Sequence, residues 1–458
     1  MGKATKRAAK RKAYRSASHA GTRGLMLAMM LALEIGAPSA ASRVRAQGAG
    51  ESGGGRVADL SRRAQQEPGN VDTQLTYGRA LIRAGQLGRA EKQLQRAVKL
   101  SKSSARALFE VARVRFAEGD YRRSRTACKS IRRAHRGHIL YEVCMARAFL
   151  VWRRASRADE HIQAAFKLDP NHLEALFALA EAQRIRGELE AGEQTYHRVL
   201  SLDPSYAEAN TGLAQLYLVH NQKRKAEAIL RKGIERHPDH PDMMYLLGTL
   251  APAAEGVRLL EGALARRPGW NDAEAALGAA LNATGQHKQA EQRLRSVLKR
   301  DPNNGLAYGG LGASLFAQGK LQHAETTLLK ALQVQPNHPD AALSLARLFA
   351  RTGRDEDAFE YFRKSAGMRA TDSGPLVEAA QLAREKGRSV LAAAFVERAL
   401  ERHPNQPLAL AMRGDLLAAR GDRAGAIASY KQALASTAGG GRRGVDRAAI
   451  EKKLRALE

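Results

Sequence analysis

Residues 305–336 have the sequence GLAYGGLGASLFAQGKLQHAETTLLKALQVQP, and this stretch decides the fold. It contains two apolar runs at helical spacing, within residues 311–315 and 321–331, which are separated by Gly319. The second run ends at Pro336, because proline cannot continue a helix. The stretch therefore predicts two helices joined by a tight turn.

The same unit recurs along the chain with a period of 34 residues, which is typical of a helix–turn–helix repeat array. Prolines mark the period at Pro170, Pro204 and Pro238, and again at Pro268, Pro302 and Pro336. We number each unit from the third residue after its proline. Position 8 is then Gly or Ala in every unit, and position 20 is small in most of them, which allows paired helices to approach closely. Position 15 is glycine in eight units, which predicts that the first helix ends there, because glycine accepts a left-handed conformation. These glycines are Gly85, Gly119, Gly187, Gly285, Gly319, Gly353, Gly387 and Gly421.

This pattern resembles the tetratricopeptide repeat family over about eleven units. The family's aromatic site, position 24, is Tyr196, Phe362 and Tyr430 in three units and leucine in several others. The resemblance implies an all-α fold, a right-handed α-solenoid of stacked antiparallel helix pairs. It also implies a non-catalytic protein–protein interaction scaffold that binds a peptide or partner helix in its concave groove.

The ends of the chain differ in composition from the repeats and suggest further segments. The predicted segments are a basic leader (1–46), a Gly-rich linker (47–55), an N-terminal capping helix (56–67), the repeat array (68–438), a Gly/Arg linker (439–445) and a C-terminal capping helix (446–458). The leader combines many basic residues with the short apolar run Leu25–Leu33, which is too short to cross a bilayer. We interpret it as a signal peptide and expect an exported, periplasmic or envelope-associated protein. Cytoplasmic and mitochondrial locations are the alternatives.

The sixth unit is shorter than the others, because only 30 residues separate Pro238 from Pro268. The missing residues correspond to about one helical turn and fall near Leu250 and Pro252. A shortened hairpin is the simpler interpretation, and a change in the path of the superhelix is the other.

The chain has two cysteines, Cys128 and Cys144. Their positions place them on the second helix of unit two and the first helix of unit three, which are packed neighbours. In an oxidising compartment they can form a disulfide that contributes roughly 3 kcal/mol. Two buried free thiols are the slightly favoured interpretation, since cysteine is often a small core residue.

The chain is strongly basic, with 75 Lys and Arg against 46 Asp and Glu. Residues 121–138 contain seven basic residues and no acidic one. The arginines of this basic patch are Arg122, Arg123, Arg125, Arg132, Arg133 and Arg136. A solvated outer face is the simpler interpretation, and a site for an acidic protein, nucleic acid or anionic lipid is the functional one.

A second set of arginines recurs at position 9, which lines the concave surface in this family. Arg79, Arg113 and Arg147 occupy it in three successive units. We call these three residues the arginine row and predict that they bind the acidic groups of a peptide, because arginine donates forked hydrogen bonds to carboxylates. Coincidence in an arginine-rich chain is the alternative. The predicted apolar walls of this groove are Leu75, Phe109, Phe116 and Val143.

Catalysis finds little support in the sequence. No phosphate-binding loop, nucleophile elbow or HExxH motif occurs, and we predict no catalytic residue, metal or cofactor. The histidines of the turn at residues 237–242 resemble a ligand cluster but fall between two repeats. The leading hypothesis is a scaffold for a protein or peptide with acidic groups. The alternative is a polyanion-binding protein that holds nucleic acid or anionic lipid on its basic surface.

Overall fold

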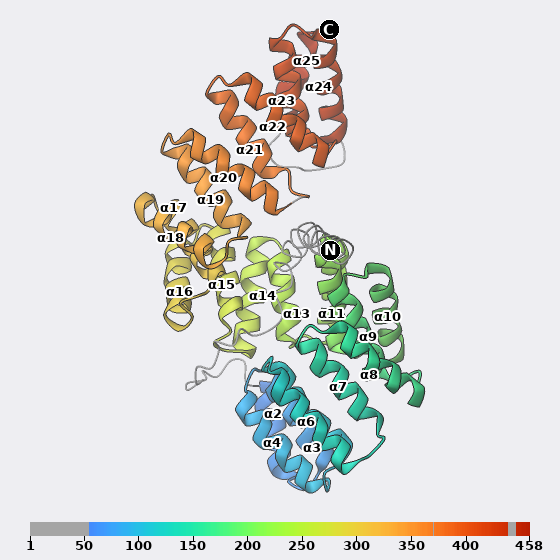
Figure 1. The fold of residues 1–458 in the computed structure, drawn as a ribbon. Helices are drawn as coiled ribbons and strands as arrows, with labels where there is room; N and C mark the ends of the chain where they lie inside the picture. Colours follow the sequence, from blue (N-terminus) through green and yellow to red (C-terminus); the bar gives the residue numbers. More distant parts are fainter. Residues whose placement is uncertain (1–54, 370, 438–445) are drawn as a thin grey trace, which may run out of the picture. The chain divides into compact units, whose positions relative to one another are not determined.

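The structure is a computed structural model, and it describes residues 55–369, 371–437 and 446–458 (Figure 1). The predicted leader, almost all of the linker at 47–55 and the whole linker at 439–445 lie outside the described residues. Within them the chain forms 24 α-helices and no β-strand, which confirms the predicted all-α fold. The helices are α2 (Gly55–Gln66), α3 (Val71–Arg83), α4 (Leu87–Leu100), α5 (Ala105–Ala117), α6 (Tyr121–Ala134), α7 (Ile139–Val151), α8 (Ala155–Leu168), α9 (Leu173–Arg186), α10 (Leu189–Leu202), α11 (Ala207–Val219), α12 (Lys223–Arg236), α13 (Pro241–Leu250), α14 (Ala253–Arg266), α15 (Asn271–Ala283), α16 (His287–Arg300), α17 (Gly305–Ala317), α18 (Leu321–Val334), α19 (Pro339–Arg351), α20 (Asp355–Met368), α21 (Gly374–Glu385), α22 (Ser389–Arg402), α23 (Pro407–Ala419), α24 (Arg423–Thr437) and α25 (Arg447–Arg455).

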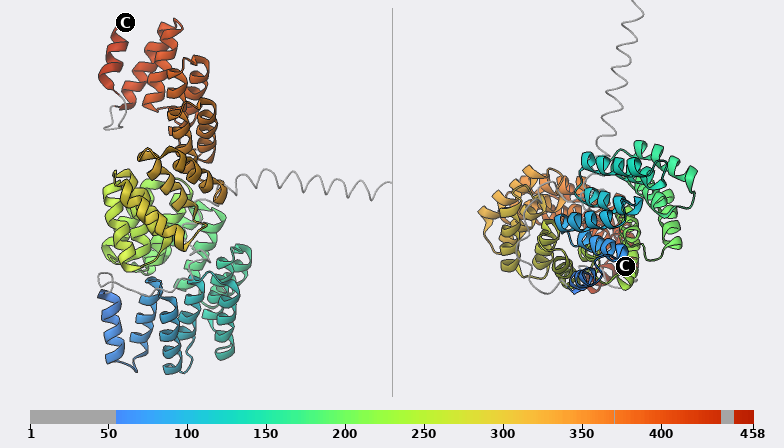
Figure 2. Two further views of the ribbon diagram at one scale, coloured as in Figure 1. Left: turned by 90° about the vertical axis from the view of Figure 1, so that its left-hand side faces the viewer. Right: turned by 90° about the horizontal axis from the view of Figure 1, so that it is seen from below.

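The helices from α3 to α24 form pairs, one pair for each predicted repeat. Each second helix from α4 to α14 and from α18 to α22 packs against the first helix of its own pair and against the first helix of the next pair. The first helices α3, α5, α7, α9, α11 and α13 also pack on one another in sequence. The left view of Figure 2 shows the helices of the first repeats, in blue to teal, standing side by side. One face of this part of the array is therefore built from first helices alone.

Small residues and turn glycines explain the regular packing. A Cβ atom added at Gly414 would lie 2.5 Å from the ring of Tyr430, so position 8 must be small where it faces position 24 of the same pair. All eight glycines at position 15 have a positive φ. The same backbone conformation occurs at position 15 where the residue is Arg153 (φ 53°) or Asn221 (φ 56°). The repeat therefore imposes the left-handed turn whichever residue occupies it.

The sixth unit is shortened where the sequence indicated. Its first helix, α13, has ten residues instead of the usual 13 or 14, and Pro252 immediately precedes α14. The two helices of this pair meet at glycines, because a Cβ atom on Gly256 would lie 2.7 Å from the carbonyl oxygen of Gly248. The shortening is thus accommodated by a close approach of two backbones.

The described chain divides into two compact units. The first comprises the described residues up to Gln289 together with Lys299–Pro302, and the second comprises Ala290–Leu298 and Asn303–Glu458. The division falls within α16, after the shortened sixth unit. At the two ends, α2 packs on α3 and α25 packs on α24. Their role as capping helices stays a prediction.

Candidate partner-binding surfaces

The arginine row lies on three neighbouring first helices, with Arg79 on α3, Arg113 on α5 and Arg147 on α7. Each guanidinium already has a carboxylate partner from the chain itself. Arg79 Nη2 donates to Glu110 Oε1 at 2.5 Å, and Arg147 Nη1 donates to Glu174 Oε2 at 2.9 Å. The row is therefore part of an internal network of ion pairs.

Arg113 lies at the centre of this network. Its Nη2 donates to Glu208 Oε1 at 2.5 Å, its Nη1 to Glu174 Oε1 at 3.4 Å, and its Nε lies 3.6 Å from Glu110 Oε2. Burial opposes the positive charge of Arg113, but Glu110, Glu208 and Glu174 outweigh it and raise the pKa of Arg113 well above its usual value. Burial also opposes the charge of Glu208, yet Arg113 and His240 lower the pKa of Glu208 to about 2. We call Arg79, Arg113, Arg147, Glu110, Glu174 and Glu208 the charged network.

Arg147 has a second environment, made of aromatic rings. Its guanidinium carbon lies 5.2 Å from the ring centres of Phe116 and Phe177 and 6.0 Å from that of Phe109. Cation–π attraction therefore adds to the ion pair with Glu174 in fixing this side chain.

Three of the predicted apolar walls are not exposed. Leu75, Phe109 and Val143 are at most 3% exposed and belong to the core, which corrects their assignment as the walls of an open groove. Phe116 is half-buried. Position 5 points toward the neighbouring helices of the array, because at least three helices pack around each of α3, α5 and α7.

The sequence contained a signal for one acidic member of the network, Glu110, that the arginine pattern alone did not reveal. At two places position 6 of the following unit is glutamate, which puts a carboxylate 31 residues after the arginine at position 9, whereas Arg113 and Arg147 are followed at that spacing by Cys144 and Ala178. Arg79 pairs with Glu110 in this way, and Arg347 pairs with Glu378, with two hydrogen bonds of 2.7 and 2.6 Å. Where a glutamate follows a position-9 arginine at this spacing, the two residues therefore form an internal ion pair.

The basic patch occupies the exposed side of α6 and the turn that follows it. Arg122, Arg123, Arg125, Arg132, Arg133 and Arg136 are all exposed. Arg123 lies near Glu118 (3.8 Å) and Asp120 (3.6 Å), and Arg132 lies over the ring of Tyr141 at 5.7 Å. Among the described residues, Arg122, Arg125, Arg133 and Arg136 have no carboxylate partner. These four unpaired arginines therefore lie on α6 and the turn that follows it, and none of them belongs to the charged network.

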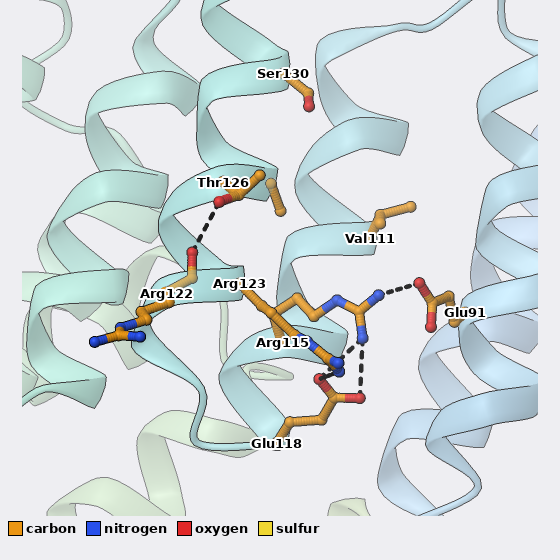
Figure 3. A pocket seen from close by; sticks show the side chains of 9 residues that line it. Glu91, Val111, Arg115, Glu118, Arg122, Arg123, Thr126 and Ser130 are labelled. Atoms are coloured by element: carbon orange, nitrogen blue, oxygen red, sulfur yellow. Dashed lines mark hydrogen bonds and ion pairs between the residues drawn. The ribbon is translucent and has the colours of Figure 1, made fainter.

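An open hollow of about 640 Å³ borders this patch. It is lined by residues of α4, α5, α6 and the turn before α6 (Figure 3): Glu91, Val111, Arg115, Glu118, Arg122, Arg123, Thr126, Ala127 and Ser130. Arg115 donates to Glu91 and, at 2.9 Å, to Glu118. Both carboxylates of the hollow are therefore already neutralised by the chain itself.

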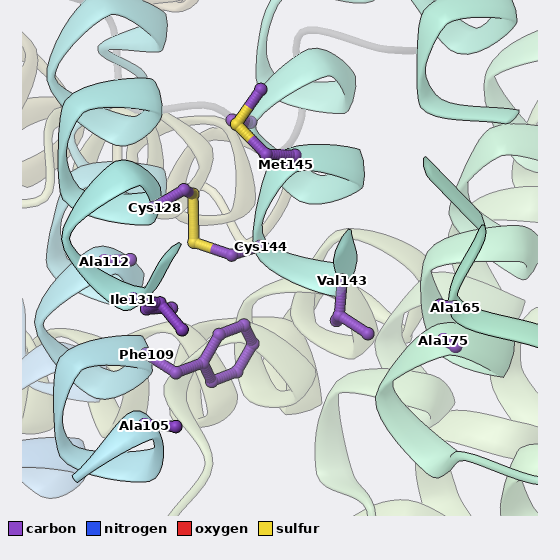
Figure 4. Packing of buried hydrophobic residues seen from close by; sticks show 11 residues of the cluster. Ala105, Phe109, Ala112, Cys128, Ile131, Val143, Cys144, Met145, Ala165 and Ala175 are labelled. Carbon is purple, nitrogen blue, oxygen red and sulfur yellow. A yellow bond between two sulfur atoms is a disulfide. The ribbon is translucent and has the colours of Figure 1, made fainter. Parts of the chain in front are cut away.

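Cys128 on α6 and Cys144 on α7 form a disulfide, and both residues are fully buried (Figure 4). The slight preference for free thiols is therefore wrong, whereas the placement of the two residues on facing helices is correct. Ile131, Phe109 and Met145 surround the bond. The disulfide joins the helix of the basic patch to the next repeat.

Neither a metal site nor a membrane span emerges from the described part of the chain. No group of three or more His, Cys, Asp or Glu residues there could hold a metal ion. None of its helices is long and apolar enough to cross a membrane. In the turn at 237–242, Asp242 instead accepts two hydrogen bonds from Arg267, at 2.9 and 2.8 Å.

Comparisons with known proteins concern the repeats. One tetratricopeptide repeat model matches residues 75–139, 145–207, 310–375 and 377–441, and a second one matches residues 184–250 and 253–315. Among solved structures, a chain in the crystal structure of the APC/C hetero-tetramer Cut9–Hcn1 is similar, with 15% identity and a TM-score of 0.47 over 87% of this chain and 85% of that chain. Yeast Tom70 is similar with 12% identity and a TM-score of 0.46, over 88% and 91% of the two chains. A search of curated proteins found no sequence that matches this chain.

Proposed function

We propose a function from the premise that this chain belongs to the tetratricopeptide repeat family, whose models match more than half of it. The chain is a non-catalytic scaffold that holds a protein partner, a peptide or a helix, against its first helices. The observation that supports this is the charged network, an ordered set of arginines and glutamates that extends from α3 to α11 on one face of the first unit.

The two ends of the network are its accessible parts. The side chains of Arg79 and Glu208 are each 35% exposed, whereas those of Arg113 and Arg147 are 14% and 16% exposed. A carboxylate of the partner binds Arg79 by exchange with Glu110, and a cation of the partner binds Glu208. The inner arginines hold the geometry and contact the partner little.

The test is affinity capture from the native host with the wild-type chain and two variants. Arg79→Gln removes the exposed guanidinium of the network. Arg347→Gln is the matched control, because Arg347 also occupies position 9 and also pairs with a glutamate 31 residues later. We expect Arg79→Gln to lose the partner and Arg347→Gln to retain it. Equal capture by all three proteins would refute the proposed site.

A second candidate function, polyanion binding, is favoured by the unpaired arginines of α6. It predicts an affinity for nucleic acid that falls steeply with salt, because phosphate contacts release counterions. Export remains part of the proposal, and the disulfide supports it, since disulfides persist in oxidising compartments. The N-terminal sequence of the mature protein tests export directly.

A further inference from the structure

We propose that the hollow between α4 and α6 is a second binding site, which takes an acidic segment of a polypeptide. This site goes beyond the proposed function, because it is formed mainly by second helices and shares no residue with the charged network.

The chemistry of the hollow suits an acidic segment of small residues. Val111 and Ala127 supply apolar surface, and the hydroxyl groups of Thr126 and Ser130 add polar atoms (Figure 3). Arg122 stands at the edge of the hollow with no carboxylate partner among the described residues. An incoming carboxylate can therefore accept charge-assisted hydrogen bonds there without displacing a group of the chain.

The charges around the hollow favour an acidic partner. On α4, the exposed Lys92, Arg96 and Lys99 have no carboxylate partner among the described residues. On α6, the exposed Arg125, Lys129 and Arg133 likewise have none there. These two helices flank the hollow, and α6 has no acidic residue. Their unpaired charges attract an anionic segment and raise its rate of association.

The shape of the hollow favours a polypeptide over the other polyanions. No aromatic ring lines it, so it offers no surface on which nucleic acid bases can stack. Its apolar surface lies between two helices, where the headgroups of a flat bilayer make little contact. A polypeptide can place small side chains on Val111 and Ala127 while its carboxylates reach Arg122.

The walls of the hollow are held in place before any ligand binds. The disulfide between Cys128 and Cys144 ties α6 to α7 on the side of α6 that faces the core. The ion pairs of Arg115 with Glu91 and Glu118 tie α4 to the end of α5. Because these elements are fixed, binding orders few groups of the protein, which favours affinity.

The test measures binding of a fluorescent peptide of alternating Glu and Ala to the full chain, by anisotropy at about 0.15 M salt. Thr126→Trp fills the hollow and changes no charge, and the exposed position of Thr126 on α6 tolerates the ring. Arg122→Gln removes the guanidinium at the edge of the hollow. Arg125→Gln is the matched control, since Arg125 is exposed on the same helix and does not line the hollow. Circular dichroism verifies that each variant keeps its helical content.

We expect Thr126→Trp and Arg122→Gln each to weaken binding about tenfold, the effect of losing one charge-assisted hydrogen bond or the contact surface. Arg125→Gln should change it less than about twofold. Equal effects of Arg122→Gln and Arg125→Gln, with no effect of Thr126→Trp, would show general attraction to a basic surface and would overturn the proposal. The proposal would also be overturned if single-stranded DNA or phosphatidylserine vesicles bound more tightly than the peptide and Thr126→Trp did not change their affinity.

Discussion

Replacing Arg113 by methionine is the sharpest test of the charged network. The substitution removes the cation that contacts Glu110, Glu174 and Glu208, and leaves these carboxylates facing one another. Breaking a buried ion pair by removing one partner costs about 3–5 kcal/mol. The side chain of Arg113 is 14% exposed, so water relieves part of the effect, and we expect a loss of about 3 kcal/mol in the free energy of unfolding.

The variant Arg79→Met is the comparison that shows whether the loss expected for Arg113→Met reflects the central position of Arg113. Arg79 has one carboxylate partner and is 35% exposed, so its loss should cost about 1 kcal/mol or less. Urea unfolding can be followed by tryptophan fluorescence, because the only two tryptophans of the chain, Trp152 and Trp270, both lie in the first unit.

A double-mutant cycle with Glu208→Gln measures the coupling energy between Arg113 and Glu208. We expect the double variant to be more stable than the sum of the single effects predicts, by at least about 1 kcal/mol, since removing Glu208 relieves the repulsion that Arg113→Met creates. A loss below about 1 kcal/mol for Arg113→Met, or strict additivity with Glu208→Gln, would refute the description of Arg113 as the centre of the network.

Three further predictions concern stability. Cys128→Ala, Cys144→Ala and the double variant should each lose about 3 kcal/mol in urea unfolding, because the bond closes a loop with a sequence separation of 16, and additive losses would contradict this. Arg153→Gly should raise the free energy of unfolding by about 1 kcal/mol, since Arg153 has a left-handed φ of 53°, and an unchanged or lower urea midpoint would contradict it. The pKa of Glu208 is lowered to about 2, so its contribution to stability is complete above about pH 4.5 and is lost as the pH falls toward 2. Thermal melting should show that loss in the wild-type chain and a smaller one in Glu208→Gln.

The features that the sequence predicted well are those that depend on neighbours within one repeat. The left-handed turn at position 15 is an example, because a glycine at that position indicates a backbone with a positive φ. Arg153 and Asn221 adopt the same conformation at that position, so the register is a better predictor of the turn than the residue itself.

The ionic partners of the arginine row could be predicted only in part. The pair Arg79–Glu110 has a spacing of 31 residues that recurs in Arg347–Glu378. The pair Arg113–Glu208 joins residues 95 positions apart, and Arg267 donates to the carbonyl oxygen of Arg83 across 184 positions. Such contacts depend on how far each repeat rotates against the next, which is the sum of many small packing effects and leaves no local pattern in the sequence.

The two proposed sites differ in whether their arginines are already paired, so the salt dependence of binding distinguishes them. At the charged network, a partner's carboxylate replaces Glu110 on Arg79, so the number of ion pairs on the protein does not change and added salt should affect binding little. At the hollow, a carboxylate meets Arg122, which has no carboxylate partner in the described chain, so binding creates new ion pairs that salt screens. A partner whose capture survives a rise in salt and fails in Arg79→Gln binds the first helices. A partner released by salt and by Thr126→Trp binds the hollow, and the net charge of +29 alone could not tell these two apart.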